Sequence, residues 1–341
     1  MRISTWCCIF VSLCAATLLL TGCGSGSQQS IGPPQISSAV YAGAPLMIPD
    51  SAGRLTKRAA RVSWISSDAI TEALLYVTDA NDGIVFVYSY PQGTLVGESC
   101  CWKEPYGACT NKRGHVWVVD DEASRIVEFA HGLETTRRLK DPGEYPVGCS
   151  VDPTTGDLAV TNYETLSGGQ GSVSVYTKAK GTPKIYSDPS ISRGWFCSYD
   201  SSGNLFVDGD QSGSSGFQLA ELPHGSSTLT NISLNQTITV PGGVQWNGKY
   251  LAIADENGPG NGVIYQFTIS GSAGTEVSAT TLDSSQNIHQ FWIDRAGNRV
   301  VAPSASLGTV GFWKFPAGGK PTKTLSGLNI PEGVAVSPGR K

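Results

Sequence analysis

The sequence predicts an all-β protein, a six-bladed β-propeller of four-stranded antiparallel blades whose ring is closed by the C-terminal strand. Three observations support this fold class. From about residue 62 the chain repeats itself roughly every 40 to 50 residues, a period typical of propeller blades. A glycine turn followed by a short apolar strand recurs along the chain, and six later strands each end in a tight turn. Radial repetition of such units limits exposed sheet edges.

The second strand of each unit carries the clearest repeat. The glycine turns lie at Gly114, Gly156, Gly203, Gly248 and Gly297, and the apolar runs are residues 75–77, 116–118, 158–160, 205–207 and 251–253. Apolar or alternating runs of this length are typical of half-buried strands. A third strand and a looser outer strand, as at residues 94–96 and 323–325, complete each unit.

Two segments compete for the inner strand of the first blade. Residues 330–338, IPEGVAVSP, carry a Pro-x-Gly sequence that also starts at Pro105, Pro146 and Pro241. Residues 61–68, RVSWISSD, match the inner-strand pattern but lack this sequence. We therefore expect the C-terminal segment to be the inner strand and residues 62–65 to lie outside the ring.

The N-terminus predicts export. Residues 1–22 form a signal peptide with Arg2 before an apolar run too short to be a preferred membrane span. Its end, Leu20-Thr21-Gly22-Cys23, resembles the bacterial lipobox, a lipoprotein signal in which the cysteine receives acyl chains such as palmitate and becomes the mature N-terminus. An ordinary secretory signal that contains a cysteine is the alternative. The resemblance implies a lipid-anchored, extracytoplasmic protein of the cell envelope, and the Gly24 that follows favours the outer membrane, facing the periplasm, in a Gram-negative host.

The remaining boundaries follow from composition. Residues 23–60 are rich in Gly, Ser, Gln and Pro and predict a flexible tether, residues 61–338 form the propeller, and residues 339–341 are a tail. The net charge is −4, only 15% of residues are charged, and the basic residues are scattered. Nucleic acid is excluded as a partner, because phosphate binding needs a clustered basic surface.

A polar residue recurs just after the second strand of most units. These residues are Asp79, Asp120, Asn162, Asp210 and Asp255, and His289 and Glu332 are expected on the same rim because the loops concerned share one face of a propeller. One interpretation is that each residue caps its own turn through nearby backbone amides. The other is a ligand or metal site at the axis, with the aromatic residues Tyr106, Tyr145 and Trp195 beside it.

The cysteines allow several pairings. Cys100 and Cys101 lie between the first and second blades, and we expect a disulfide between Cys101 and Cys109, with Cys149 as an alternative member of a pair with Cys100 or Cys101. Cys149 and Cys197 otherwise fit small buried positions between blades. A redox pair of Cys100 and Cys101 is a further alternative. Zinc spacings are absent from the sequence.

The repeat over residues 62–338 resembles the NHL-repeat and SMP-30-type six-bladed propellers. The resemblance implies a fold that hosts binding modules, scaffolds and hydrolases alike. SMP-30-type lactonases hold a divalent ion with a Glu of the first inner strand and with Asn and Asp of other blades. Glu332 is similar in position to that Glu, whereas Thr110, Ser150 and Ser198 stand at other inner-strand positions and depart from the pattern.

Two functions remain after these comparisons of residues. The first is a membrane-anchored binding or scaffolding module for a protein, peptide or glycan, without catalysis and without a cofactor. The alternative is a metal-dependent hydrolase, like a lactonase or esterase, with Ca or Zn held at the propeller axis near Glu332. Stoichiometric metal in the purified protein distinguishes the second from the first.

Overall fold

The computed structural model describes residues 65–66, 69–132, 135–214, 216–256 and 261–339. The chain divides into two compact units, residues 1–39 and 40–341, and every described residue belongs to the second. The predicted signal peptide, Cys23, the tether and residues 340–341 lie outside the described residues. Within the described ranges no helix combines the length and the apolar character needed to cross a membrane.

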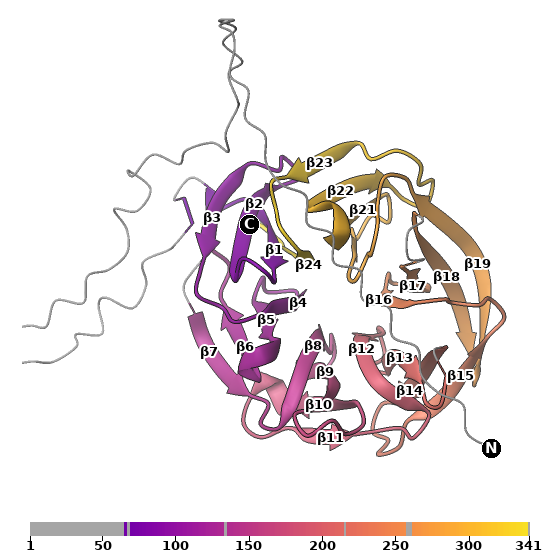
Figure 1. Ribbon diagram of the computed structural model, residues 1–341. Helices are drawn as coiled ribbons and strands as arrows, with labels where there is room; N and C mark the ends of the chain where they lie inside the picture. The colour runs from indigo at the N-terminus through magenta and orange to yellow at the C-terminus, as the bar shows by residue number, and fades with distance from the viewer. Residues whose placement is uncertain (1–64, 67–68, 133–134, 215, 257–260, 340–341) are drawn as a thin grey trace, which may run out of the picture. The chain divides into compact units, whose positions relative to one another are not determined.

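The described residues form 24 strands in five sheets (Figure 1). The first sheet contains, in spatial order, β24 (Pro331–Ser337), β1 (Ala73–Asp79), β2 (Ile84–Tyr90) and β3 (Leu95–Ser99). The second contains β4 (Pro105–Thr110), β5 (Val116–Asp120), β6 (Arg125–Phe129) and β7 (Thr135–Lys140). The third contains β8 (Glu144–Val151), β9 (Leu158–Thr165), β10 (Ser172–Tyr176) and β11 (Lys184–Tyr186).

The remaining strands form one large and one small sheet. The large sheet contains β12 (Ile191–Tyr199), β13 (Leu205–Gln211), β14 (Phe217–Leu222), β15 (Thr230–Leu234), β19 (Ala273–Leu282), β18 (Gly262–Ser270), β17 (Leu251–Asp255) and β16 (Pro241–Trp246). The small sheet contains β20 (Trp292–Ile293), β21 (Arg299–Ser304), β22 (Thr309–Lys314) and β23 (Lys323–Ser326). Three single-turn 3-10 helices, η3 (Asp121–Ala123), η4 (Thr177–Ala179) and η5 (Ala305–Leu307), join strands.

The predicted division into six four-stranded blades is wrong, because the large sheet has eight strands. Its two halves meet where the outer strands β15 and β19 pair in parallel, Ser233 opposite Ala273 and Leu234 opposite Gly274. The Ser233 amide donates to the Ser272 carbonyl at 2.9 Å. β19 is ten residues long, so its first residues extend to a neighbouring outer strand that the repeat pattern treats as separate.

The C-terminal segment occupies the position expected for it. β24 pairs antiparallel with β1, with Tyr76 opposite Ala335, so the last strand of the chain completes the first sheet. All seven residues of β24 are buried. Ile65, from the competing segment, forms a single bridge with Gly97 in β3, at the outer edge of the same sheet.

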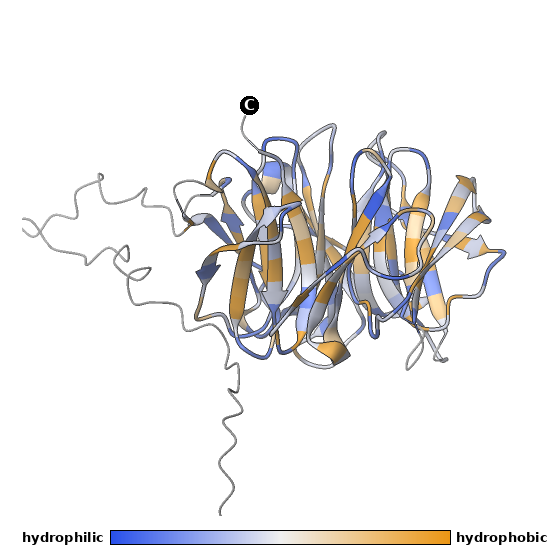
Figure 2. Cartoon of the chain, turned by 90° about the horizontal axis from the view of Figure 1, so that it is seen from above, coloured by the Kyte–Doolittle hydropathy of each residue, from blue (hydrophilic) through white to orange (hydrophobic). Residues whose placement is uncertain are grey.

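Apolar side chains fill the space between successive sheets. Trp117, Val160, Phe206 and Ile253 come from β5, β9, β13 and β17 and belong to one buried cluster. Burying such side chains is the main stabilising term for stacked sheets. Apolar residues follow the strands and polar residues gather in the loops at both edges (Figure 2). The loops at the two ends of the innermost strands are therefore the places where polar chemistry can occur.

Candidate functional site

The innermost strands form a closed series around the axis (Figure 1). β4 contacts β8 and β24, β12 contacts β8 and β16, and β20 contacts β24. Gln245 in β16 completes the series by donating its Nε2 hydrogen to the Ile293 carbonyl in β20 at 3.0 Å. The first residues of these strands meet at one end of the axis and their last residues meet at the other, which gives two candidate sites.

The Pro-x-Gly sequences start several inner strands and bring their backbones together. A Cβ atom on Gly107 would lie 2.4 Å from the Val147 carbonyl oxygen, and one on Gly333 would lie 2.4 Å from the Tyr106 carbonyl oxygen. Only glycine allows this approach. The residues just before these glycines, Tyr106 and Glu332, both reach the same neighbour, His289.

His289 is the centre of the first site, which we name the acidic end and define by Glu104, Tyr106, Asp121, Glu256, His289 and Glu332. Its Nδ1 forms an ion pair with Glu332, and its Nε2 lies 3.3 Å from a Glu256 oxygen. The Tyr106 ring stacks on the imidazole at 5.9 Å between centroids. Burial alone would lower the pKa of His289, but the hydrogen bonds and charges of Glu256 and Glu332 outweigh it and raise the pKa to about 10.

Other carboxyl groups make this end acidic. Burial, reinforced by Glu104 and Glu122, raises the pKa of Asp121 to about 7. Burial and the neighbouring charges of Glu122 and Glu332 also raise the pKa of Glu104. Because His289 carries one positive charge between two glutamates, the group retains excess negative charge at neutral pH. The central side chains, His289, Glu256 and Glu332, nevertheless form ion pairs with one another.

The recurring acids predicted for a rim have a structural role. Asp79, Asp120, Asn162 and Asp255 each lie opposite the proline of the Pro-x-Gly sequence in the inner strand of their own sheet, namely Pro331, Pro105, Pro146 and Pro241. The carboxylate of Asp79 accepts hydrogen bonds from the amides of Asn329 and Ile330, at 2.7 and 3.0 Å. Asp120 accepts from Lys103 and Glu104, and Asp255 from Thr239 and Val240. These acids hold the segment that leads into the inner strand.

Two predicted rim residues differ from this pattern. Gly209, opposite Gly194, occupies the position that an acid holds elsewhere, so Asp210 is one residue out of register. Asp210 instead accepts a hydrogen bond from Trp195 Nε1 at 3.1 Å. Asn162 donates to Ser172 and Ser174, and no backbone amide of the described residues donates to it. The structure therefore brings His289, Glu332 and the expected aromatic neighbour Tyr106 together, and it places the recurring polar residues that follow the second strands in separate contacts.

The alternative of a metal-dependent hydrolase receives no support from the acidic end. Across the described residues, no group of three or more His, Cys, Asp or Glu side chains has an arrangement that could hold a metal ion. The Glu332 carboxylate, the proposed metal ligand, pairs with His289. A carboxylate neutralised by a neighbouring cation is a poor ligand for a second cation.

The second site is a depression of about 1120 Å³ at the other end of the axis, where residues at the ends of the inner strands, such as Thr110, Val151 and Val336, line it. Six cationic side chains line it, Lys112, Arg113, Arg137, Lys178, Lys180 and Arg295, against two carboxylates, Glu128 and Asp152. Four aromatic side chains, Tyr90, Trp117, Trp246 and Trp292, lie on its wall. We call this site the basic depression.

Most cations of the basic depression have no anionic partner among the described residues. Arg137 lies 3.6 Å from Glu128, but in the described part of the chain the other five form no ion pair within 4.0 Å. Lys112, Arg113, Lys178, Lys180 and Arg295 are exposed. The sequence pattern did not predict this site. The available signal was the placement of Lys112, Arg113 and Arg295 in the same turn that joins the first two strands of different units.

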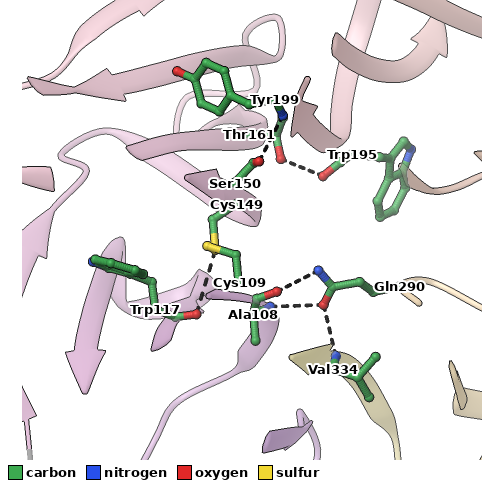
Figure 3. The surroundings of a disulfide bond; sticks show 10 residues. All are labelled: Ala108, Cys109, Trp117, Cys149, Ser150, Thr161, Trp195, Tyr199, Gln290 and Val334. Atoms are coloured by element: carbon green, nitrogen blue, oxygen red, sulfur yellow. Dashed lines mark hydrogen bonds between the residues drawn. A yellow bond between two sulfur atoms is a disulfide. The ribbon is translucent and has the colours of Figure 1, made fainter. Parts of the chain in front are cut away.

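One disulfide joins neighbouring inner strands. Cys109 in β4 bonds to Cys149 in β8, and the predicted pair of Cys101 and Cys109 is wrong (Figure 3). Cys100 and Cys101 are exposed thiols, and Cys197 is a buried thiol. Cys109 stands one residue further along β4 than Cys149 does along β8, and the two neighbouring inner strands lie close enough for the sulfurs to bond although 40 residues separate them. The interpretation of Cys149 as a small apolar residue is corrected.

Gln290 links three inner segments beside this disulfide. Its Oε1 accepts hydrogen bonds from the amides of Ala108 and Val334, each at 3.0 Å, and its Nε2 donates to the Ala108 carbonyl at 2.8 Å (Figure 3). The side chain thereby holds the segment before β20 against β4 and β24. A half-buried amide with all of these partners fixes the position of the adjacent His289.

Comparisons with known proteins establish the fold alone. No family model matches the sequence, and no curated protein matches it. The chain is similar to a chain in the crystal structure of a nidogen/laminin complex, with 12% identity, a TM-score of 0.62, and coverage of 79% of this chain and 100% of that one. A protein of unknown function from Bacteroides caccae gives 13% identity, a TM-score of 0.58 and coverage of 78% and 99%.

A third structure adds the same information. A functionally unknown protein from Desulfotomaculum acetoxidans DSM 771 shares 12% identity, with a TM-score of 0.51 and coverage of 75% of this chain and 80% of that one. At these identities the likeness is one of fold. Together with the closed series of inner strands, it identifies the described unit as a β-propeller-like all-β fold.

Proposed function

We propose that this protein is a binding module that takes an acidic segment of a partner protein into the basic depression. The observation that carries the proposal is the set of five exposed cations without ion-pair partners, in the described residues, around a concave aromatic surface. Concave sites with aromatic walls and a few charged groups are typical ligand sites. Carboxylates of a partner would supply the counter-charge that these cations lack within the described part of the chain.

The aromatic residues suit a peptide ligand. Trp246 and Trp292 are half-buried, so part of each side chain is exposed in the depression and the rest packs against the protein. Tryptophan and arginine are the residues that most often carry binding energy at protein interfaces. Trp117 is buried, and its Nε1 has no hydrogen-bond partner among the described residues.

Fold similarity supports a protein as the partner class. One similar structure was solved as a nidogen/laminin complex, that is, with a protein partner. The same fold also carries other functions, so the choice of partner rests chiefly on the charge of the depression. An acidic glycan is the competing ligand and is separated by experiment below.

We also propose that Cys23 is lipidated and anchors the domain on the outside of the cytoplasmic membrane or on the outer membrane. The support is the lipobox-like sequence Leu20-Thr21-Gly22-Cys23 and the Gly/Ser-rich segment after it. Labelling with an alkyne analogue of palmitate should mark the wild-type protein and spare a Cys23→Ser variant. Equal labelling of both proteins would contradict the anchor.

Binding to the basic depression is tested with defined probes. A fluorescent peptide of alternating Glu and aromatic residues should bind the full chain, and the affinity should fall as salt rises because the contacts are between charges. The Lys112→Glu/Arg113→Glu variant should bind at least tenfold more weakly, whereas Arg138→Glu, a charge reversal outside the depression, should bind as the wild type does. Alginate serves as the acidic glycan probe. Tight binding of alginate with none of the peptide would overturn the proposal.

A further inference from the structure

A group of oxygen-bearing side chains in the third sheet has unsatisfied acceptors. Asp141 and Asn162 are 0% exposed, and Glu144 is 6% exposed. Asp141 Oδ2, Glu144 Oε2 and Asn162 Oδ1 are buried atoms without a hydrogen-bond partner among the described residues. Leaving a buried acceptor unpaired is destabilising and buried polar atoms are nearly always hydrogen-bonded, so three unpaired ones in one place require an explanation.

Hydrogen bonds place these three residues around common neighbours. Asn162 Nδ2 donates to the hydroxyls of Ser172 and Ser174 at 2.9 and 3.1 Å, and the Ser174 hydroxyl donates to Asp141 Oδ1 at 2.9 Å. Glu144 interacts with Ser172 and with the charge of Asp141. The two serines are successive same-face residues of β10, so the amide and both carboxylates converge on one side of that strand.

A tight turn supplies both carboxylates. In Asp141-Pro142-Gly143-Glu144 the Glu144 amide donates to the Asp141 carbonyl, which makes the two acids the first and last residues of the turn. Gly143 has a φ of 87°, a left-handed value that glycine adopts without strain. The turn therefore holds two carboxylates close together, and no cation among the described side chains pairs with either.

Three other sheets show that this arrangement is a departure from the repeat. Asp79, Asp120 and Asp255 bind amides of the segment that leads into the inner strand. At the same register position the third sheet has Asn162, opposite Pro146, and its leading segment supplies acids instead. The local charge is thus two carboxylates against none, and the amide oxygen of Asn162 is left as a third acceptor.

We propose that Asp141, Glu144 and Asn162, with the hydroxyls of Ser172 and Ser174, form a calcium-binding site within the third sheet. Calcium takes six to eight oxygen ligands from carboxylates, amide oxygens and water, and these residues offer only oxygen. Two carboxylates balance the charge of one Ca²⁺. Only two of these ligands are acids, and the others are amide and hydroxyl oxygens. The site is therefore not one of the groups of three or more His, Cys, Asp or Glu side chains that are absent from the described residues.

The electrostatics agree with this assignment. Burial, together with the charge of Asp141, raises the pKa of Glu144 to about 7, and burial raises the pKa of Asp141. Like charges buried together hold a proton unless a cation replaces it. Proton retention alone is therefore the competing explanation, and a direct binding measurement decides between them.

Terbium luminescence and thermal unfolding of the full chain test the site. Tyr176 interacts with Asp141 and can transfer excitation energy to Tb³⁺ bound there. We expect Tb³⁺ emission that Ca²⁺ displaces, and a rise in Tm of about 5 °C at a Ca²⁺ concentration 100 times its Kd. Glu144→Gln, which keeps the shape of the side chain, should weaken Ca²⁺ binding at least tenfold, as should Asp141→Asn.

Two further variants control the result. Asp208→Asn changes another fully buried carboxyl, whose Oδ2 also has no partner among the described residues, and should retain the Ca²⁺ response. Asn162→Asp adds a third carboxylate and should bind Ca²⁺ more tightly, even if Glu144→Gln fails to fold. No displaceable Tb³⁺ emission together with an unchanged Tm, or a Kd within twofold of wild type in Glu144→Gln, would overturn the proposal in favour of a retained proton.

Discussion

The two ends of the axis are built by the same inner strands and differ in whether their charged side chains pair with one another or face solvent. At the acidic end His289 is held between Glu256 and Glu332, so the central charges neutralise one another inside the protein. At the basic depression Lys112, Arg113, Lys178, Lys180 and Arg295 face solvent, and among the described residues only the sixth cation, Arg137, pairs with a carboxylate. Internally paired charges contribute to stability, whereas unpaired ones are available to a ligand. The following predictions test this division of roles.

The largest effect is expected from removing β24, which runs from one end of the axis to the other. Deletion of residues 330–341 removes a strand whose seven residues are all buried and leaves β1 without its inner partner. We expect the cooperative melting transition in circular dichroism to disappear. Deletion of residues 340–341 alone should leave it in place. An unchanged transition in the longer deletion would show that another segment fills the inner position.

The next largest effect is expected at the disulfide. Cys109→Ala/Cys149→Ala opens a covalent link across 40 residues between β4 and β8. Loss of such a link should lower the free energy of unfolding by about 2 to 4 kcal/mol, measured by urea denaturation. Cys100→Ala, at an exposed thiol, is the matched control and should change it by less than about 0.5 kcal/mol. Equal effects in the two variants would refute a stabilising role for this bond.

His289→Gln should destabilise the acidic end by about 3 kcal/mol near pH 6, because the buried carboxylates of Glu256 and Glu332 lose the cation between them. The pKa of His289 rises from 6.5 to about 10 on folding. The stabilisation is therefore complete below pH 6.5 and is lost as pH rises toward 10. Urea denaturation at pH 6 and pH 10 should show the difference between wild type and variant shrinking. A difference that grows with pH would contradict this ion-pair assignment.

The smallest effect on stability is expected at the basic depression. Lys112→Glu/Arg113→Glu changes exposed side chains that form no ion pair with a described residue, so the free energy of unfolding should stay within about 0.5 kcal/mol of wild type. The measurement is the urea denaturation midpoint. A loss comparable to that of His289→Gln would mean that these cations support the fold, and the contrast between the two ends would fail.

The sequence pattern predicted local features well. The strands at residues 75–77 and 251–253 form as expected, and Pro331 with Gly333 placed β24 correctly, because a turn residue and an alternating run act over a few residues. The contact of His289 with Glu332 could also be anticipated. Glu332 precedes Gly333 in one inner strand, and His289 precedes Gln290 at the corresponding position before the neighbouring inner strand.

The features that the sequence did not predict correctly depend on contacts between repeat units. β15 and β19 are outer strands, whose sequence repeat is the weakest. Nothing in the sequence of either strand indicates that the two pair. The partner of Cys109 is set by the spacing of β4 and β8 around the axis, not by sequence distance. The cations of the basic depression come from separate turns, as Arg113 and Arg295 do, so no local run of charged residues in the sequence predicts it.

Hydrogen–deuterium exchange of the full chain, with and without a saturating acidic peptide, tests the central claim most directly. Binding in the basic depression should slow exchange in the turns at residues 111–115, 152–156 and 294–298, which border it. Exchange at residues 103–107 and 288–290, which belong to the acidic end, should not change. Protection of the acidic end with none in the three turns would contradict the assignment of ligand binding to the basic depression.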